Sequence, residues 1–573
     1  MSKFPKPLNI MIQNVTPVID GGRFAIKREP MDRTIVSADL FRHSHEKIDA
    51  AVIFRRRGEK KWHKSPMTQG NNDRWTGEFV VTELGYYEYA VSAWTISPKD
   101  KVHRSNVYEL RVDPTYARVG AWYEIFPRSQ GQVEGAWGTW VDCKNRLGEI
   151  KDMGFDVIYT VPIHPIGVTN RKGPNNSLIC NEGDPGCNYA IGSSEGGHFH
   201  TDPNLGTQEQ FEDFMSSARK MGFQMALDIA LNCSPDHPHV KTNPEWYYHE
   251  EDGSIKFAEN PPKKYEDIYP YDYYNENHQA LWEEIRDMLL HWVDQGFTIF
   301  RIDNPHTKPF PFWEWVISEV KTKHPQTVFL SEAFTRPKVM QYLAKLGFDQ
   351  SYTYFTWRTD KFEMREYCEE LTQSPLTEYM RGNFFPTTPD ILPEHLQNAP
   401  REMFILRLLL ASTLSSSYGM VNGYELCENK PFPNKEEYWN SEKYDFKVRD
   451  WNAEGNIKDW VKKFNQIRNE HPALQEYDNL RFHDCNNDQI MVYSKRHEVT
   501  NDCMLFIVNF DIENSQSGEI VLNLEDLGLS NRREYQVTDT FDGASYTWNG
   551  TTNFVVLDPK NGPGHAFSVH QKG

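Results

Sequence analysis

An arginine and an aspartate two residues apart form the stretch of this sequence best suited to chemistry. Arg301 and Asp303 follow the short apolar run 298–300, which is typical of a buried strand. Because side chains alternate along a strand, both point to one face, where the guanidinium can hold the carboxylate ionised and aim it as a nucleophile. A purely structural ion pair is the alternative, and a partner carboxylate would argue against it.

Further carboxylates lie at the ends of other apolar runs. Asp228 lies in the run 224–229, Glu332 follows 327–330, and Asp390 follows 383–385. Each of them alone could be a helix cap or a buried ion-pair partner. Crowding four carboxylates with Arg301 at successive strand ends is unfavourable for stability, and it is typical of sites where pKa values are pushed apart.

Two of these carboxyl groups suit glycosyl transfer. Retaining enzymes place two carboxyls about 5–5.5 Å apart, one as the nucleophile and the other as acid and then base. Asp303 fits the nucleophile. Glu332 fits the general acid and base, since its neighbours Phe329, Leu330 and Phe334 are apolar and burial raises a carboxyl pKa.

The elements that must position these side chains are strands alternating with helices, which predicts an α/β fold. Eight such units predict a (β/α)₈ TIM barrel over residues 117–475, with the active site at the C-terminal ends of its strands. The stretch 232–278, rich in aromatic residues and proline, is predicted to be a lobe inserted after the third strand. We expect strands at 121–125, 157–161, 224–229, 298–302, 327–330, 351–355, 383–385 and 416–421, and helices at 140–153, 207–221, 279–295, 312–324, 337–346, 361–371, 401–413 and 457–471.

Short alternating strands separated by turn residues lie on either side of the predicted barrel. Such patterns are typical of β-sandwiches. We therefore predict an N-terminal immunoglobulin-like β-sandwich over residues 1–116 and a C-terminal β-sandwich over 476–573. The clearest of these strands are 34–40, 51–54 and 86–91 in the first region and 489–493, 504–508 and 553–557 in the second.

Composition and charge narrow the classes of partner. The net charge is −19, and no block of lysine and arginine stands out, which argues against a nucleic acid or an anionic membrane as partner. Aromatic residues make up 13% of the chain; they suit stacking on sugar faces, although large cores use them equally. Residues 1–20 show no secretory leader, and no window reaches transmembrane length, so we expect a cytoplasmic protein.

Eight cysteines without a disulfide-framework spacing agree with a reducing compartment. Cys180 and Cys187 are close enough in sequence for a loop disulfide or half of a metal site. No second cysteine–histidine pair completes a zinc set. We therefore predict neither a metal nor a cofactor.

These residues together resemble the α-amylase superfamily, and more narrowly the bacterial maltosyltransferases that extend α-1,4-glucans from α-maltose 1-phosphate. The match spans the predicted catalytic core. It implies retaining transfer by double displacement, with a maltooligosaccharide or glycogen as acceptor. The motifs that carry it are His164-Pro165-Ile166-Gly167, Asn260-Pro261-Pro262-Lys263-Lys264-Tyr265, Asp303-Asn304-Pro305-His306-Thr307-Lys308 and Ser441-Glu442-Lys443-Tyr444, with 171–176, 192–198 and 233–238.

The resemblance implies roles for particular residues. Asp303 would be the nucleophile, Glu332 the general acid and base, and Asp390 the carboxylate that holds ring hydroxyls, with Arg301 beside them. A lysine charge next to amide and phenol donors suits a phosphate dianion. The implied phosphate pocket is Asn260, Lys263, Tyr265 and Asn304, and the implied maltosyl-binding residues are Lys172, Asp228, Asn232, Lys443 and Tyr444. For Lys172 and Lys443 the alternative is a solvated surface lysine.

Three departures from the family bear on these expectations. Asn232 stands where the family usually has glutamine, which leaves the exact donor open. The N-terminal region lacks the helical insertion that helps form the family's dimer, so a homodimer is only one candidate assembly. The pair Cys180 and Cys187 is a third departure. The alternatives to a maltosyltransferase are an amylase-type hydrolase or transglycosylase acting without phosphate, and a non-catalytic glucan-binding protein.

Overall fold

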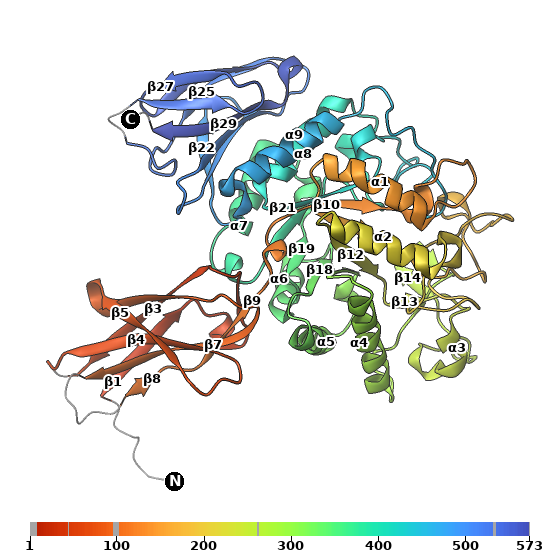
Figure 1. The fold of residues 1–573 in the computed structure, drawn as a ribbon, viewed down its shortest axis with the longest axis horizontal. Helices are drawn as coiled ribbons and strands as arrows, with labels where there is room; N and C mark the ends of the chain where they lie inside the picture. The colour runs from red at the N-terminus through yellow and green to blue at the C-terminus, as the bar shows by residue number, and fades with distance from the viewer. Residues whose placement is uncertain (1–8, 44, 96–101, 261–262, 531–533, 572–573) are drawn as a thin grey trace, which may run out of the picture.

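A computed structural model describes residues 9–43, 45–95, 102–260, 263–530 and 534–571 of the chain. Eight parallel strands of this described part close into a barrel in the order β10-β11-β12-β17-β18-β19-β20-β21. One sheet region precedes the barrel in sequence and one follows it, and both lie to its left in Figure 1. This confirms the predicted fold class. The predicted domain boundaries stay a prediction. The barrel strands are β10 Gly120–Ile125, β11 Val157–Thr160, β12 Gln224–Ile229, β17 Ile299–Asp303, β18 Val328–Glu332, β19 Gln350–Tyr352, β20 Gly382–Phe384 and β21 Ser417–Val421.

The barrel strands are apolar and buried because helices cover their outer face and side chains fill the interior. Capping boxes start two of these helices: Thr139 with Asp142, and Thr207 with Gln210. The helices are α1 Trp140–Asp152, α2 Gln208–Lys220, α4 His278–Asp294, α5 Phe310–Lys323, α6 Pro337–Leu346, α7 Lys361–Leu371, α8 Arg401–Leu414 and α9 Lys458–Glu470. None of the helices in the described residues is long and apolar enough to cross a membrane.

Three strand predictions differ from the structure in a way that matters for the site. β17 and β18 run on to Asp303 and Glu332, so both carboxylates belong to the last strand residue and not to the loop that follows. β19 ends early, at Tyr352, because the Thr353 side chain accepts a hydrogen bond from the Phe355 amide and starts a short 3₁₀ helix, η9 Tyr354–Trp357.

A small group of short elements is inserted between β12 and α4. Two short antiparallel pairs build it, β13 with β16 and β14 with β15. Its elements are β13 Asn232–Cys233, α3 Pro238–Thr242, β14 Ala258–Asn260, β15 Lys263–Tyr265 and β16 Tyr269–Pro270.

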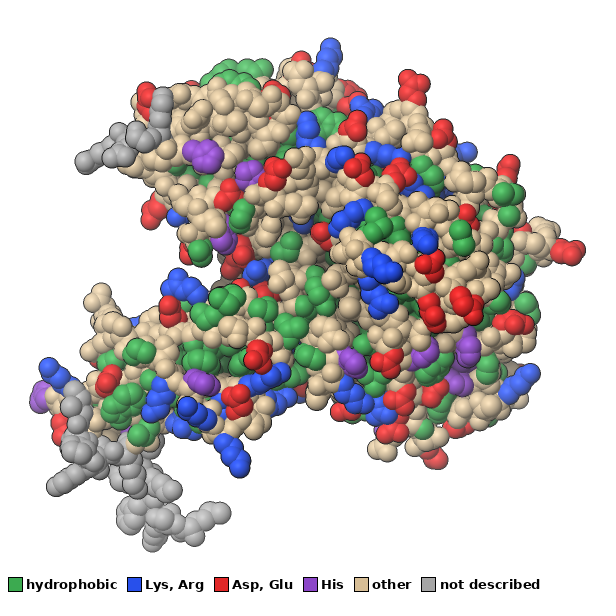
Figure 2. Space-filling model, viewed as in Figure 1, with side chains coloured by type: hydrophobic (Ala, Val, Ile, Leu, Met, Phe, Trp, Pro, Cys, Tyr) green, Lys and Arg blue, Asp and Glu red, His purple; other side chains and the backbone are tan. Residues whose placement is uncertain are grey.

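A β-sandwich lies on each side of the barrel in sequence, and Figure 2 shows an open notch between the two on one face of the molecule. In the first, β1 contacts β7 and β4 contacts β6, so the sheet folds over on itself. Its strands are β1 Ile10–Thr16, β2 Ile26–Arg28, β3 Arg33–Arg42, β4 Ile48–Arg56, β5 His63–Gln69, β6 Arg74–Val80, β7 Gly85–Thr95, β8 His103–Arg104 and β9 Tyr108–Val112; those of the second are β22 Leu480–Cys485, β23 Ile490–Arg496, β24 Cys503–Asn509, β25 Gln516–Val521, β26 Tyr535–Asp539, β27 Ser545–Trp548, β28 Thr552–Leu557 and β29 Gly564–Gln571.

A buried charge cluster joins the first sandwich to the barrel. The Arg111 Nη2 atom lies 2.6 Å from Asp349 Oδ1, and the Lys321 Nζ atom lies 2.8 Å from the same oxygen. Asp113 completes the cluster through Lys321, at 3.0 Å. All four side chains are almost fully buried. Because buried charges are costly without partners, each of them depends on the others.

We expect Asp349→Ala to destabilise this junction by about 3–5 kcal/mol, because it leaves two buried cations with one partner fewer. The midpoint of chemical unfolding would measure the loss. The matched control is Asp152→Ala, which breaks the exposed pair between Asp152 and Lys462 and should shift the midpoint little. Equal shifts for the two variants would contradict a structural role for the cluster.

Candidate active site

Three adjacent barrel strands bring the predicted charged residues together. In the β12–β17 pair Asp228 lies opposite Arg301, and in the β17–β18 pair Asp303 lies opposite Glu332. Neighbouring strands lie about 4.7–4.9 Å apart, and side chains at paired positions point the same way. The register therefore places the Asp303 and Glu332 carboxyls side by side at the C-terminal rim of the barrel.

Arg301 lies at the centre of this group. Its Nη1 atom is 3.1 Å from Asp228 Oδ1 and 2.9 Å from Asp303 Oδ1, and its Nη2 atom is 3.9 Å from Glu332 Oε2. Burial by itself would raise the pKa of Asp303, but the charges of Arg301 and Lys308 outweigh it and lower this pKa below its usual value. Asp303 is therefore a carboxylate that is ionised and aimed.

Glu332 has the opposite protonation behaviour. Burial, assisted by the negative charge of Asp303, raises the pKa of Glu332 to about 7, although Arg301 opposes the shift. The amide of Asn304 donates to Glu332 Oε2 at 3.1 Å, and the Asn304 side chain donates to Asp303 Oδ2 at 3.2 Å. Asn304 reaches both because its backbone is left-handed, at φ 45°, a conformation that asparagine tolerates well. One carboxyl is thus ionised while its neighbour keeps a proton near neutral pH.

Asp228 is fully buried behind Arg301. The hydroxyl groups of Tyr159 and Tyr189 each donate to its Oδ2 atom at 2.8 Å. Burial, opposed by Arg301, raises the pKa of Asp228 to about 6. This carboxyl holds Arg301 and the two tyrosines in place.

Lys443 and Tyr444 lie on the rim beside Asp390. The Lys443 ammonium is 2.8 Å from Asp390 Oδ1 and lies over the Tyr189 ring, 4.5 Å from its centre. Tyr444 packs with Tyr189 in a small apolar cluster. Lys172 is 2% exposed, and its ammonium pairs with Glu266. Lys172 is therefore buried and not a solvated surface lysine, and Lys443 is held by an ion pair at the rim.

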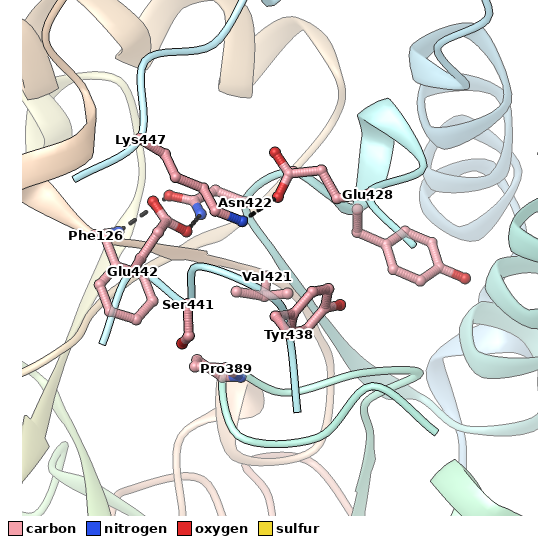
Figure 3. A pocket seen from close by; sticks show the side chains of 11 residues that line it. Phe126, Pro389, Val421, Asn422, Glu428, Tyr438, Ser441, Glu442 and Lys447 are labelled. Carbon is pink, nitrogen blue, oxygen red and sulfur yellow. Dashed lines mark hydrogen bonds and ion pairs between the residues drawn. The ribbon is translucent and has the colours of Figure 1, made fainter. Parts of the chain in front are cut away.

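Hydrogen bonds and an ion pair of Glu442 hold the loop that carries Lys443 in place (Figure 3). Asn422 donates to Glu442 Oε2 at 2.8 Å, and its own side-chain oxygen accepts from the Phe126 amide at 3.0 Å. Arg449 binds both oxygens of Glu442, at 2.7 and 2.8 Å. Such a bidentate pair fixes position as well as charge.

The predicted phosphate pocket is described only in part. Asn260 lies opposite Lys263 in the β14–β15 hairpin, but the side chains of both lie outside the described part of the chain. Tyr265 packs beside the cluster that contains Tyr189 and Tyr444. Asn232 begins β13 in the lobe, and its side-chain oxygen is buried without a hydrogen-bond partner among the described residues.

The structure describes all eight cysteines, and all are free thiols. Cys180 is exposed and Cys187 is buried, so the loop disulfide considered from the sequence does not form. Burial raises the pKa of the Cys187 thiol to about 12, which makes it unreactive.

Sequence reasoning missed several residues of the site. Tyr159 and Tyr189 look like ordinary apolar-segment aromatics, and only their contacts reveal a role. Lys308 was visible within a matched motif; its ammonium donates to the carbonyl oxygens of Asp303 at 3.3 Å and Asn304 at 3.1 Å. Glu124 could have been found from the sequence, because it is a charged residue inside an apolar strand. It is fully buried, and burial raises its pKa well above the usual range.

Two family models match parts of this chain, and known proteins share its sequence and its fold. Residues 9–102 match the family described as "Alpha-1,4-glucan:maltose-1-phosphate maltosyltransferase, domain N/S", and residues 482–569 match "GLGE, C-terminal". The protein named alpha-1,4-glucan:maltose-1-phosphate maltosyltransferase from Rhodospirillum rubrum is 41% identical, covering 99% of this chain and 96% of its own. Its namesake from Myxococcus xanthus is also 41% identical, covering 98% and 97%.

Among solved structures, a maltogenic alpha-amylase from Thermotoga neapolitana superposes with a TM-score of 0.61 at 19% identity, covering 79% of this chain and 99% of its own. A cyclomaltodextrinase superposes with a TM-score of 0.62 at 12% identity, covering 97% and 99%. At such low identity these two matches establish the fold alone.

Proposed function

The chain belongs to the alpha-1,4-glucan:maltose-1-phosphate maltosyltransferase family, and we propose that it moves a maltosyl unit from α-maltose 1-phosphate to the non-reducing end of an α-1,4-glucan. Phosphate is released, and the α configuration is retained. The observation that carries this proposal is the pairing of Asp303 and Glu332 in register on adjacent strands, with pKa values shifted in opposite directions.

In the first step the Asp303 carboxylate attacks the anomeric carbon of the maltosyl unit. The bond from that carbon to the phosphate oxygen breaks, and the phosphate leaves with the electron pair. Glu332 supplies a proton to the departing oxygen. The ester formed on Asp303 carries no negative charge, so one of the causes that raise the pKa of Glu332 disappears.

In the second step the 4-hydroxyl of the acceptor attacks the same carbon. Glu332 has given its proton to the phosphate, and its lowered pKa keeps it deprotonated. It accepts the hydroxyl proton of the acceptor, and the bond from the anomeric carbon to Asp303 breaks. Two displacements at one carbon restore the α configuration. The loss of the Asp303 charge thus converts Glu332 from acid to base within one catalytic cycle.

Binding of the donor is assigned to residues around this pair. We propose that Asp390, Lys443, Tyr444 and Lys172 hold the maltosyl unit. Lys443 pairs with Asp390 and lies over the Tyr189 ring, and Tyr444 belongs to the same apolar cluster as Tyr189. Lys172 is assigned by the family motif. Asp228 would help to hold the maltosyl site in place through its hydrogen bond with Tyr189. Asn232 would contribute to the same site from the lobe. The phosphate pocket stays assigned to Asn304, Asn260, Lys263 and Tyr265 by the family motif. A cytoplasmic location and a homodimer also remain predictions.

The decisive experiment incubates the protein with α-maltose 1-phosphate and maltohexaose. We expect chains that grow in steps of two glucosyl units, with one inorganic phosphate released for each step, measured by mass spectrometry and a phosphate assay. Free maltose or glucose as the main product would favour the amylase-type hydrolase. Glucan binding without any turnover would favour the non-catalytic protein.

A further inference from the structure

The order of the barrel strands indicates which part of the rim lies next to the donor and which part next to the acceptor. The residues proposed to hold the donor follow β11 (Lys172), β20 (Asp390) and β21 (Lys443), and the inserted lobe follows β12. The C-terminal ends of β18 and β19, which lie between β17 and β20 in the barrel order, carry neither the lobe nor a residue assigned to the maltosyl unit. In a glucosyl ring C1 and C4 are at opposite ends, so the acceptor approaches C1 from the side away from the rest of the donor. The acceptor therefore arrives over β18 and β19.

Three aromatic side chains form a ridge in this direction. Phe334, two residues after Glu332, contacts Trp357 edge to face with 5.1 Å between ring centres, and Tyr354 at 6.4 Å. The Trp357 indole nitrogen donates to Glu436 at 3.0 Å, and the Tyr354 hydroxyl donates to the Thr335 carbonyl at 2.9 Å. All three rings are half-buried and held in place. Fixed, partly exposed rings suit stacking on sugar faces, because little freedom is lost on binding.

A cavity continues from this ridge along the outside of the barrel between α6 and α7. Its volume is about 340 Å³, within the range of small-ligand sites, and Tyr354 belongs both to the ridge and to the cavity wall. The Arg358 guanidinium lies 5.3 Å from the centre of the Tyr367 ring on the same wall. Apolar faces and polar groups therefore alternate along it. The residues that matter are Met340, Gln341, Tyr354, Arg358, Tyr367 and Glu370.

We propose that the ridge and this cavity, together the α6–α7 groove, bind the acceptor α-1,4-glucan beyond its reacting glucosyl unit. The inference rests on the proposed transferase function and extends it to the acceptor. A glucan fits because each glucosyl unit has apolar ring faces and hydroxyl groups round its edge, the same alternation as the groove. Phe334 of the ridge lies two residues after Glu332, and Tyr354 is shared by the ridge and the cavity, which favours the acceptor chain over an unrelated apolar ligand.

If the groove binds the acceptor, the binding affinity should depend on the length of the acceptor chain. This affinity can be measured without catalysis. In the Asp303→Ala background, titration calorimetry should show that a long linear maltodextrin binds about tenfold more tightly than maltotriose. Gln341→Trp, which fills the groove from a half-buried surface position, should remove this difference and leave maltotriose binding unchanged. Arg358→Ala should reduce the difference in the same direction.

The matched control is Phe362→Ala, an exposed position of α7 outside the cavity wall, which should keep the preference for long chains. Equal binding of short and long acceptors by the unsubstituted groove would overturn the proposal, as would equal losses in Gln341→Trp and Phe362→Ala. An apolar dye that fills the groove and is not displaced by maltodextrin would also overturn it, in favour of an apolar ligand.

Phosphate release by the otherwise unsubstituted enzyme separates this proposal from the proposed function. Normal release with maltotriose as acceptor, together with no effect of Gln341→Trp on use of glycogen, would defeat the groove and leave the transferase standing. No release with any acceptor would defeat the transferase, and the titration would still decide whether the groove binds glucan.

Discussion

Asp303→Ala should lower kcat/KM for α-maltose 1-phosphate by a factor of about 10⁴–10⁶, because removing a covalent nucleophile removes the reaction pathway. The loss is measured as phosphate release. Arg301 and Asp228 keep their 3.1 Å contact without Asp303, so the barrel should remain folded. An unchanged thermal unfolding curve would establish that the effect is chemical.

The role of Asp303 has a direct check that needs no variant. A fluorinated maltosyl donor forms the ester and releases it slowly, and peptide mapping of the trapped enzyme should locate the sugar on Asp303. A label on Asp228 or Asp390 would contradict the assignment. Asp228 would be an unexpected position, because it is fully buried and two tyrosines and Arg301 already occupy its oxygens.

Glu332→Ala is expected to separate the two half-reactions. Phosphate is a good leaving group without an acid, so the ester on Asp303 should still form, while transfer to a sugar hydroxyl loses its base and slows by a factor of about 10²–10⁴. Intact-mass spectrometry should then reveal protein heavier by one maltosyl unit. Loss of phosphate release without any adduct would show that Glu332 is needed before the ester forms.

The pH dependence tests the same residue. The pKa of Glu332 is raised to about 7, so its proton is present below that pH and lost above it. Some donors have a leaving group that needs the proton of Glu332. With such a donor, the first half-reaction should slow as the pH rises through about 7. At low pH the rate should fall as Asp303, whose pKa is lowered, finally gains a proton. Glu332→Gln should abolish the alkaline limb, and a limb that persists would belong to another group.

Much of the catalytic centre could be predicted from local sequence because the barrel repeats one simple rule. Buried parallel strands read as apolar runs, and the first polar residues after them lie on one rim. This is why the sequence predicts Asp228, Arg301, Asp303 and Glu332 close together. In the structure Arg301 contacts all three carboxyl groups.

Only the tertiary structure decided the environment of each side chain, because segments far apart in the chain create it. Lys172 and Lys443 look like solvated lysines in sequence, yet Glu266 and Asp390 pair with them inside the site. Tyr189 reaches Asp228 from a loop that follows β11.

The sequence by itself determined the fold class and the set of carboxyls predicted to react, since both follow from periodicity and from the order of residues along single strands. The sequence did not reveal the opposite pKa shifts of Asp303 and Glu332. Nor did it reveal the contact of Phe334 with Trp357 beside the α6–α7 groove. They depend on barrel closure, because register and burial bring together charges and rings from different strands, and distance through space sets their interaction.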